Sequence, residues 1–467
     1  MRKIIIGLLG VVCVNGWTLS KAPLHLTLNE AILLGVREHP NVIAAQLSDV
    51  LRKYNYVVQQ WAFSPHYAIN GSVTYNRSKL AEIESTQGKN VSLEPSVSWL
   101  SPVGTQMTLT ASNDYSNNYH PSLSLKVTQP LLRGFGSAIV ESALNNAKDD
   151  LAISTLSIEG TLRNTVTNVI NAYLTVLSAQ QSILIDQKAL ARAEMSQHQT
   201  ELFIKAGHKA GNELITVEAN VASAKSQLEN DTNNLEQARF GLLAAIGLDP
   251  NSKVDFAPLN LETLQAHYLP IDLKAAQEAT LRHDIQFQVD NLVLNGQAMR
   301  NLAMAKDNTR WQLNLSASAM VGSSTDGTNT GVNGLLDAQN QAQNIGLSLV
   351  IPIGDKAAEE SVLSAKIAIK QARLGLQQER WSLETNAINT WNSVQSAKRA
   401  LQFARAAEKL QQDTYQLSYQ KYIHGLIDSL ELQTAQLQLT QAQQVSLIAE
   451  MNYIKALVQL DLLMGHT

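Results

Sequence analysis

The amino-acid sequence contains two copies of one pattern, and this internal duplication limits the possible folds more than any other feature. Residues 207–247 align without a gap with residues 425–465, at a shift of 218 residues. A repeat unit of about half the chain indicates a tandem duplication and excludes a solenoid of short repeats. We therefore expect two structural repeats, at 23–250 and 272–467, joined by an irregular linker at 251–271.

The first 22 residues are typical of a secretory signal peptide. Arg2 and Lys3 precede an apolar stretch that is too short to span a bilayer. The only cysteine, Cys13, lies inside this segment, so the mature protein is expected to have no disulfide, and Val12 argues against lipid attachment at that position. The formal net charge of −4 offers no basic surface for nucleic acid.

Two long stretches without proline predict two helical hairpins, at 137–246 and 355–464. Gly207 and Gly425 fall where each hairpin must turn, as a glycine that ends a helix does. The longer helix of each hairpin would have roughly 70 residues and a length of about 105 Å, more than a globular domain accommodates. Apolar residues recur every seven positions, as in coiled coils. One such stripe consists of Leu162, Val169, Val176, Ile183 and Leu190.

Alternating apolar and polar residues predict strands before each hairpin, at about 65–131 and 310–353, with a helix at 272–306 in between. The strands have about ten residues each, enough to cross an outer membrane at a tilt. A transmembrane barrel and a soluble sandwich both produce this alternation. The export signal and the polar loops between the strands favour the barrel.

The number of strands has a consequence for assembly. Stretches at 91–99 and 105–112 raise the count to four in the first half, against two in the second half. Six strands are too few to close a barrel, for which eight is about the minimum, and lipid does not tolerate an open edge. If these strands enter a membrane, several copies of the chain must share one barrel.

These features together resemble the TolC family of outer-membrane efflux and secretion channels. The resemblance rests on the order, spacing and duplication of five segments along the chain. They are LTLNEAILLGVREHP near the N-terminus, TQPLLRGFG (128–136), AGHKAGNELITVEANV (206–221), VIPIGDK (350–356) and HGLIDSLELQTAQL (424–437).

The resemblance implies a homotrimer in the outer membrane that extends into the periplasm. Its fold class would be mainly α with membrane β: a shared trimeric β-barrel continued by a long α-helical coiled-coil barrel, with two repeats per chain. The implied partners are a periplasmic adaptor protein, an inner-membrane pump of the RND or ABC type, and outer-membrane lipid. Family barrels have four strands per chain, so 91–112 could be either an extra hairpin in the wall or a surface loop.

The resemblance also implies a gate and periplasmic aperture near the two helical turns. Carried over by position, the gate acid is Glu213 and its tyrosine partner is Tyr422. Glu431 corresponds to the first of two acids that ring the tunnel entrance. Thr434 replaces the second, while Asp428 adds an acid nearby. In the family, an arginine helps to hold the gate closed; this chain has Ile427 at that position. On sequence alone, Glu213 and Glu431 could equally be ordinary acidic residues in the first turn of a helix.

The sequence favours a passive exit duct for a tripartite efflux pump or a type I secretion system, and not an enzyme. No catalytic constellation, metal-ligand spacing or nucleotide motif stands out, so no cofactor or metal is expected. The alternatives are a periplasmic adaptor and a coiled-coil structural or surface protein without channel activity. Two duplicated hairpins and membrane-type strands argue against both, and the cargo stays open.

Overall fold

The computed structural model describes residues 24–78, 86–116, 119–252, 254–256, 272–323, 331–336 and 340–465. The expected signal peptide and most of the expected linker lie outside these residues. The chain divides into two compact units: the first takes its residues from Met1–Ile43, Thr161–Ala276 and Ala387–Thr467, and the second from Ala44–Gly160 and Gln277–Asn386. Among the described residues, no helix combines the length and the apolar character needed to cross a lipid bilayer.

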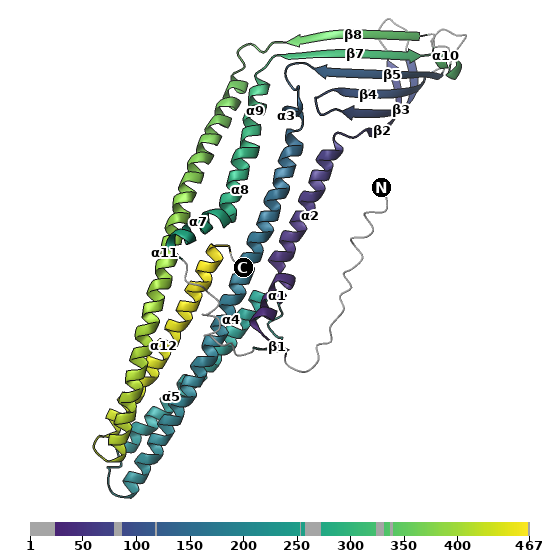
Figure 1. The fold of residues 1–467 in the computed structure, drawn as a ribbon. Helices are drawn as coiled ribbons and strands as arrows, with labels where there is room; N and C mark the ends of the chain where they lie inside the picture. Colours follow the sequence, from purple (N-terminus) through teal and green to yellow (C-terminus); the bar gives the residue numbers. More distant parts are fainter. Residues whose placement is uncertain are drawn as a thin grey trace. The chain divides into compact units, whose positions relative to one another are not determined.

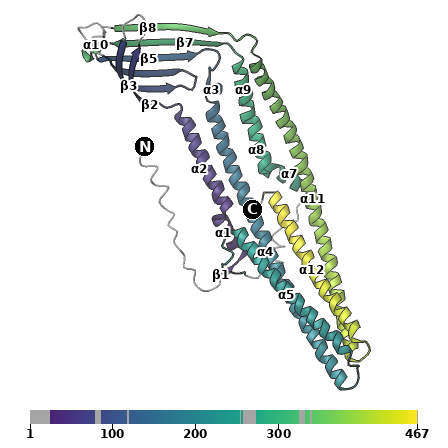
Figure 2. The same ribbon diagram turned by 180° about the vertical axis from the view of Figure 1, so that it is seen from behind.

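The chain forms two helical hairpins, whose residues from Thr161 to Ile246 and from Ala387 to Leu463 make up most of the first unit (Figures 1 and 2). The first consists of α4 (Ser142–Lys205) and α5 (Glu213–Ile246), and the second of α11 (Lys356–Ile423) and α12 (Ser429–Leu463). Proline is absent from all four helices, so no residue interrupts their hydrogen-bond ladders by lacking an N–H group. At 64 residues, α4 has a length of about 96 Å.

The main core of the first unit lies where α4 and α5 pack against two short strands. β1 (Leu24–Leu26) pairs in parallel with β6 (Val254–Phe256). The fully buried Tyr173 of α4 donates its hydroxyl hydrogen to the carbonyl oxygen of Leu26 at 3.3 Å, and its ring meets that of Phe256 edge to face. β6 lies within the linker that was expected to be irregular, and that expectation was wrong for Val254–Phe256.

A short helix, α1 (Leu28–Glu38), follows β1 and joins the same core. Thr27 and Glu30 form a reciprocal capping box at its start, which satisfies two backbone N–H groups. Gly35 packs so tightly that an added Cβ would lie 2.9 Å from a methyl carbon of Val169. Any larger residue at that position would therefore force α1 away from α4.

A six-stranded antiparallel sheet forms the strand part of the second unit (Figure 1). Its order is β2-β3-β4-β5-β7-β8, so each strand pairs with the next strand of the same sheet along the chain. The strands are β2 (His66–Ser78), β3 (Thr86–Leu100), β4 (Gln106–Tyr115), β5 (Tyr119–Pro130), β7 (Gln312–Gly322) and β8 (Asn340–Val350). The sequence allowed two interpretations of the segment at 91–112, an extra hairpin or a surface loop. In the structure this segment belongs to the interior strands β3 and β4 of the sheet.

The second unit also contains α2 (Pro40–Trp61) from Ala44 onward, α3 (Ser137–Val140), α8 (Ile285–Val293), α9 (Met299–Asn308) and α10 (Val332–Leu336). The single helix expected at 272–306 is interrupted. α7 (Leu273–His283) ends before Asp284, whose backbone is extended. The Asp284 side chain caps α8 by accepting a hydrogen bond from the N–H of Phe287 at 2.7 Å. A π-helical turn, η1 (Leu294–Ala298), separates α8 from α9. The expectation of one continuous helix was therefore wrong.

Candidate gate at the helical turns

Both hairpins of the first unit turn in the same way. Gly207 and Gly425 have positive φ angles of 73° and 71°, which favour glycine. At the first turn the N–H of His208 donates to the carbonyl oxygen of Phe203 at 2.9 Å, and at the second the N–H of Leu426 donates to that of Lys421 at 2.9 Å. These bonds end α4 and α11 with the same glycine-dependent cap, the Schellman motif.

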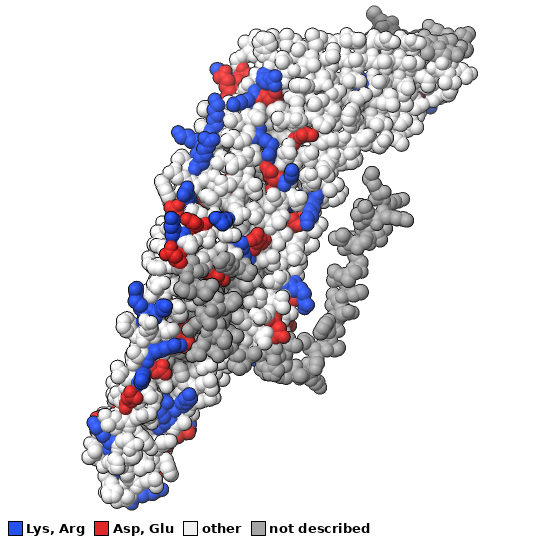
Figure 3. Space-filling view, viewed as in Figure 1, with Lys and Arg blue, Asp and Glu red and all other residues white. Residues whose placement is uncertain are grey.

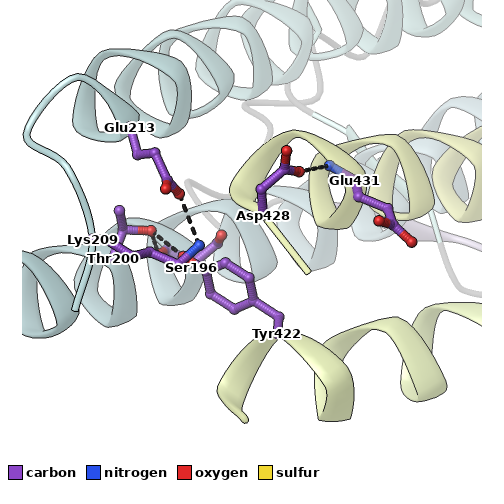
Figure 4. Close-up of polar contacts among 7 residues, drawn as sticks. All are labelled: Ser196, Thr200, Lys209, Glu213, Tyr422, Asp428 and Glu431. Atoms are coloured by element: carbon purple, nitrogen blue, oxygen red, sulfur yellow. Dashed lines mark hydrogen bonds and ion pairs between the residues drawn. The ribbon is translucent and has the colours of Figure 1, made fainter. Parts of the chain in front are cut away.

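Tyr422, the predicted tyrosine of the gate, is fully buried between the two hairpins (Figure 4). Its hydroxyl oxygen lies 2.6 Å from the hydroxyl oxygen of Thr200 on α4. The Thr200 hydroxyl already donates its one hydrogen to the carbonyl oxygen of Ser196, so Tyr422 is the donor of the shared bond. The ring of Phe203, also on α4, packs edge to face against the Tyr422 ring.

Lys209 joins the predicted gate acid to the tyrosine. Its ammonium nitrogen lies 2.8 Å from a carboxylate oxygen of Glu213 and 4.2 Å from the centre of the Tyr422 ring. The Lys209 side chain is only 9% exposed, so water screens these interactions weakly. One cation thus contacts a carboxylate of the first turn and an aromatic face of the second hairpin (Figure 4).

Glu213 also reaches across to the second turn. Burial would raise its pKa, but hydrogen bonds from Lys209 and from the hydroxyl and backbone N–H of Ser429 outweigh that effect, and the net pKa is lowered. Ser429 is the first residue of α12 and is buried. The Glu213 carboxylate therefore ties the two turns together when it is ionised.

The three predicted aperture residues lie at the start of α12 and make local contacts. Asp428 caps that helix by accepting the N–H of Glu431 at 2.8 Å. The Glu431 side chain is exposed in the first turn of the helix. The hydroxyl of Thr434 donates to the carbonyl oxygen of Leu430 at 2.9 Å, within the same helix. Both predicted acids are thus exposed, and Asp428 has a structural role as a cap in addition.

Polar contacts between the hairpins continue away from the turns. Gln436 of α12 is buried; it accepts from the Asn220 amide at 3.2 Å and donates to the carbonyl oxygen of Arg192 at 3.3 Å. The Arg192 guanidinium donates to Thr440 at 3.0 Å and lies over the ring of Tyr415, 5.7 Å from its centre. Burial lowers the pKa of Arg192. Such buried polar layers fix the register of packed helices, because a shift would leave their groups unpaired.

A pair of buried carboxyls lies farther along the same hairpins. Asp186 of α4 and Asp231 of α5 are 2% and 9% exposed. Burial, together with the neighbouring Asp231 carboxyl, raises the pKa of Asp186 to about 6. The amide of Gln444 on α12 donates to Asp186 at 3.5 Å, and Ser182 donates to Gln444 at 2.9 Å. Two carboxyls so close are most stable when they share one proton.

Sequence reasoning named Glu213 and Tyr422, which Lys209 contacts in the structure, but it did not name Lys209, Thr200 or Ser429. Lys209 could have been found, because the alignment places this cation of the first turn opposite the apolar Ile427 of the second. Thr200 and Ser429 give no sequence signal, since small hydroxyl residues are common along these helices. Among the residues that the structure describes, no cluster of three or more His, Cys, Asp or Glu side chains could hold a metal ion.

Comparisons with known proteins agree with this architecture. The family model of outer membrane efflux proteins matches residues 36–248 and 296–466. A search of curated protein sequences gave no significant match.

Three proteins of known structure have a similar fold at low sequence identity. CusC is 15% identical, with a TM-score of 0.73 over 96% of this chain and 96% of its own. OprN is 14% identical, with a TM-score of 0.72 over 94% and 90%. VceC from Vibrio cholerae is 15% identical, with a TM-score of 0.71 over 94% and 96%. Because the family model matches most of the sequence in two segments, one per repeat, the chain belongs to the outer membrane efflux protein family.

Proposed function

We propose that this protein is a trimeric outer-membrane channel that forms the exit duct of a tripartite efflux pump or a type I secretion system. Transport through it is passive, and the energy comes from an inner-membrane pump to which a periplasmic adaptor connects it. Membership of the outer membrane efflux protein family supports the channel role. The apolar face of the six-stranded sheet supports insertion into a lipid bilayer.

The channel is gated at the periplasmic turns of the two hairpins. The observation that carries this proposal is the contact of Lys209 with both Glu213 and Tyr422, because it joins residues from both hairpins. Opening would separate the turns and break this contact together with the hydrogen bond between Tyr422 and Thr200. Glu431 and Asp428 would then give the aperture a negative charge that favours cations.

The adaptor would bind at the exposed apolar side chains around the same turns. Ile215, Leu426 and Leu430 are 70%, 73% and 60% exposed in the single chain. Apolar side chains clustered at one end of a helical unit are typical of a protein-binding surface. Cysteines at these three positions should form crosslinks to the adaptor in cells.

The alternatives are a periplasmic adaptor and a structural or surface protein without channel activity. Both predict that the purified protein conducts no ions. An adaptor would also be recovered without the outer membrane, whereas we expect the chain in the outer-membrane fraction as a trimer that dissociates on heating in detergent.

Planar-bilayer conductance of the purified trimer tests the channel and its gate together. We expect small, rarely open conductances for the wild type and more frequent opening for Tyr422→Phe, which loses the bond to Thr200. Tyr419→Phe is the matched control, since Tyr419 lies on the same helix and its hydroxyl donates to the sulfur of Met195 at 3.4 Å. Absence of any conductance in all three proteins would exclude the channel function. Equal opening of the two variants would exclude Tyr422 from the gate.

A further inference from the structure

The hairpin of β3 and β4 is built into the sheet and is not an addition at its edge. β2 pairs along its whole length with β3, and β5 pairs with β4 on one side and β7 on the other. In the described chain, β3 is the one strand with which β2 pairs. Each of the six strands has ten or more residues, the length that crosses an outer membrane.

One face of the sheet is apolar across all six strands. The registers align Tyr67 with Val97, Val97 with Leu109 and Leu109 with Leu125. The face continues from Leu125 to Ala319 in β7, and β7 aligns Ala317 with Ile345 in β8. Exposed apolar residues on this face of the single chain are Tyr67, Ile69, Val73, Val91, Leu93, Trp99, Leu109, Leu123, Leu125, Leu315, Ile345, Leu347 and Leu349.

The opposite face is polar across the same strands. Ser96 of β3 aligns with Thr110 of β4, and Thr110 with Ser124 of β5. β5 aligns Lys126 with Ser318, and Ser318 aligns with Asn344 of β8. β3 and β4 thus have the same apolar and polar faces as the strands on either side of them, which a surface loop would not require. In the view of Figure 3, charged side chains line the helices and are nearly absent over the strands.

Both outer edges of the sheet are unprotected. Within the described residues, β2 and β8 each pair on one side only. β8 contains no charged residue and no proline, and β2 contains only Arg77. Soluble proteins usually block such edges with charges, prolines or bulges, and lipid does not tolerate them at all. In a lipid bilayer each edge would therefore need a further strand beyond those of the described residues.

A second copy of the chain fits these edges in direction as well as in chemistry. Neighbouring strands of the sheet are antiparallel, so an even count of six makes β2 and β8 antiparallel to each other. β8 of one copy can then pair with β2 of the next in an antiparallel ladder of about 11 residues. Repeating this contact by rotation closes a ring without an edge.

We propose that the membrane barrel of this protein has eighteen strands, six from each of three copies, in place of the twelve that four strands per chain would give. This inference rests on the trimer of the proposed function. Because barrel diameter grows roughly linearly with strand number, the bore would be about one and a half times as wide, in the range of barrels that hold an open aqueous channel. The barrel would then admit solutes that a twelve-stranded wall excludes.

Lysine substitutions on adjacent residues of β4 test whether the hairpin lies in the wall. Leu109→Lys places a charge on the apolar face and should abolish recovery of trimers from the outer membrane, as Leu125→Lys on β5 should. Thr110→Lys on the polar face should leave the trimer yield within about twofold of wild type. Normal assembly of Leu109→Lys beside failure of Leu125→Lys would overturn the eighteen-strand barrel and leave the trimeric channel intact.

Cysteine labelling gives a second measurement that does not depend on a variant that could misfold. In a Cys13→Ser background, a fluorophore at Leu109→Cys should be quenched by lipid-attached nitroxides, and Thr110→Cys should react with a charged, water-soluble maleimide. Reaction of both positions with the charged reagent would place the hairpin outside the bilayer and reject the proposal. A protein that is labelled as expected but runs as a dimer would reject the trimer and, with it, the strand number.

Discussion

The ammonium group of Lys209 lies against the ring of Tyr422, with 4.2 Å between the nitrogen and the ring centre. The lysine belongs to the turn of the first hairpin and the tyrosine to the last turn of α11 in the second. The second turn carries Ile427 at the aligned position, so the cation of this contact comes from one repeat only. The two copies of the duplicated turn have therefore taken different roles.

Lys209→Ala should favour the open channel. The substitution removes the cation–π contact and the ion pair with Glu213, which together are worth about 1–2 kcal/mol in a partly buried site. We expect open probability in planar bilayers to rise roughly fivefold to thirtyfold. Lys205→Ala, an exposed lysine at the end of α4, is the matched control. An unchanged open probability for Lys209→Ala would show that this contact does not hold the gate closed.

Acid should open the channel through Glu213. Its pKa is lowered in the folded protein, because the hydrogen bonds from Lys209 and Ser429 outweigh burial. Its stabilising contribution is therefore complete above the ordinary value of 4.5 and is lost as the pH falls through the lowered folded value. Conductance recorded from pH 7 down to pH 3 should rise at the acid end.

Glu213→Gln should conduct at pH 7 as the wild type does in acid, with a weaker response to pH. Glu218→Gln, an exposed acid on the same helix, should keep the wild-type profile. If the acid response persisted in Glu213→Gln, another group would have to carry it.

The stabilising contribution of Asp186 should decrease as the pH rises, which is opposite to that of Glu213. Its folded pKa of about 6 lies above the ordinary value of 3.8, so the folded protein binds this proton more tightly than the unfolded chain. The contribution is complete below pH 3.8, declines from there to about pH 6, and is absent above it. Asp186→Asn should therefore raise the free energy of unfolding by about 1–3 kcal/mol at pH 7.5, where the wild type holds two close buried carboxylates.

The measurement is the melting temperature of the purified trimer at pH 7.5 and pH 5. Asp186→Asn should melt higher than the wild type at pH 7.5, and the difference should shrink at pH 5. Asp413→Asn, an exposed position on α11, should match the wild type at both values. A variant that melts lower at pH 7.5 would contradict the assignment of a shared proton.

Gly425→Ala should destabilise the second turn. The φ angle of 71° is unfavourable for a residue with a Cβ atom, at a cost of about 1–2 kcal/mol, although no atom blocks the added carbon. Gly375→Ala is the informative control, because Gly375 lies inside α11 with open space around it and alanine there should stabilise the helix by up to about 1 kcal/mol. Thermal melts that moved in the same direction for both variants would argue against a conformational role of Gly425.

The sequence predicts the elements that repeat and does not predict the contacts between them. The duplicated glycines and the proline-free stretches indicate both hairpins, because backbone rules act locally. Alternation indicates all six strands, yet it gives no information on whether β3 and β4 lie in the wall or outside it. That answer requires the register, which aligns Val97 with Leu109 and Leu109 with Leu125.

Contacts across the hairpins are the part of the site that the sequence could not supply. Asp186 and Asp231 lie on different helices, and neither has a neighbour in sequence that predicts their meeting. Tyr422 and Thr200 are separated by 222 residues. Short elements are not predicted for a different reason. Three-residue strands such as β1 and β6 form only because they pack against the core of α4 and α5.

The pairing of β1 with β6 sets an order of events during folding. Leu26 and Phe256 are aligned partners in this parallel pair and lie in the same buried core as Tyr173. A chain delivered from its N-terminus presents Leu26 long before Phe256 has arrived, and closing so long a loop is slow. The N-terminal strand must therefore wait for the whole first hairpin, and during that interval its apolar residues are available to a chaperone.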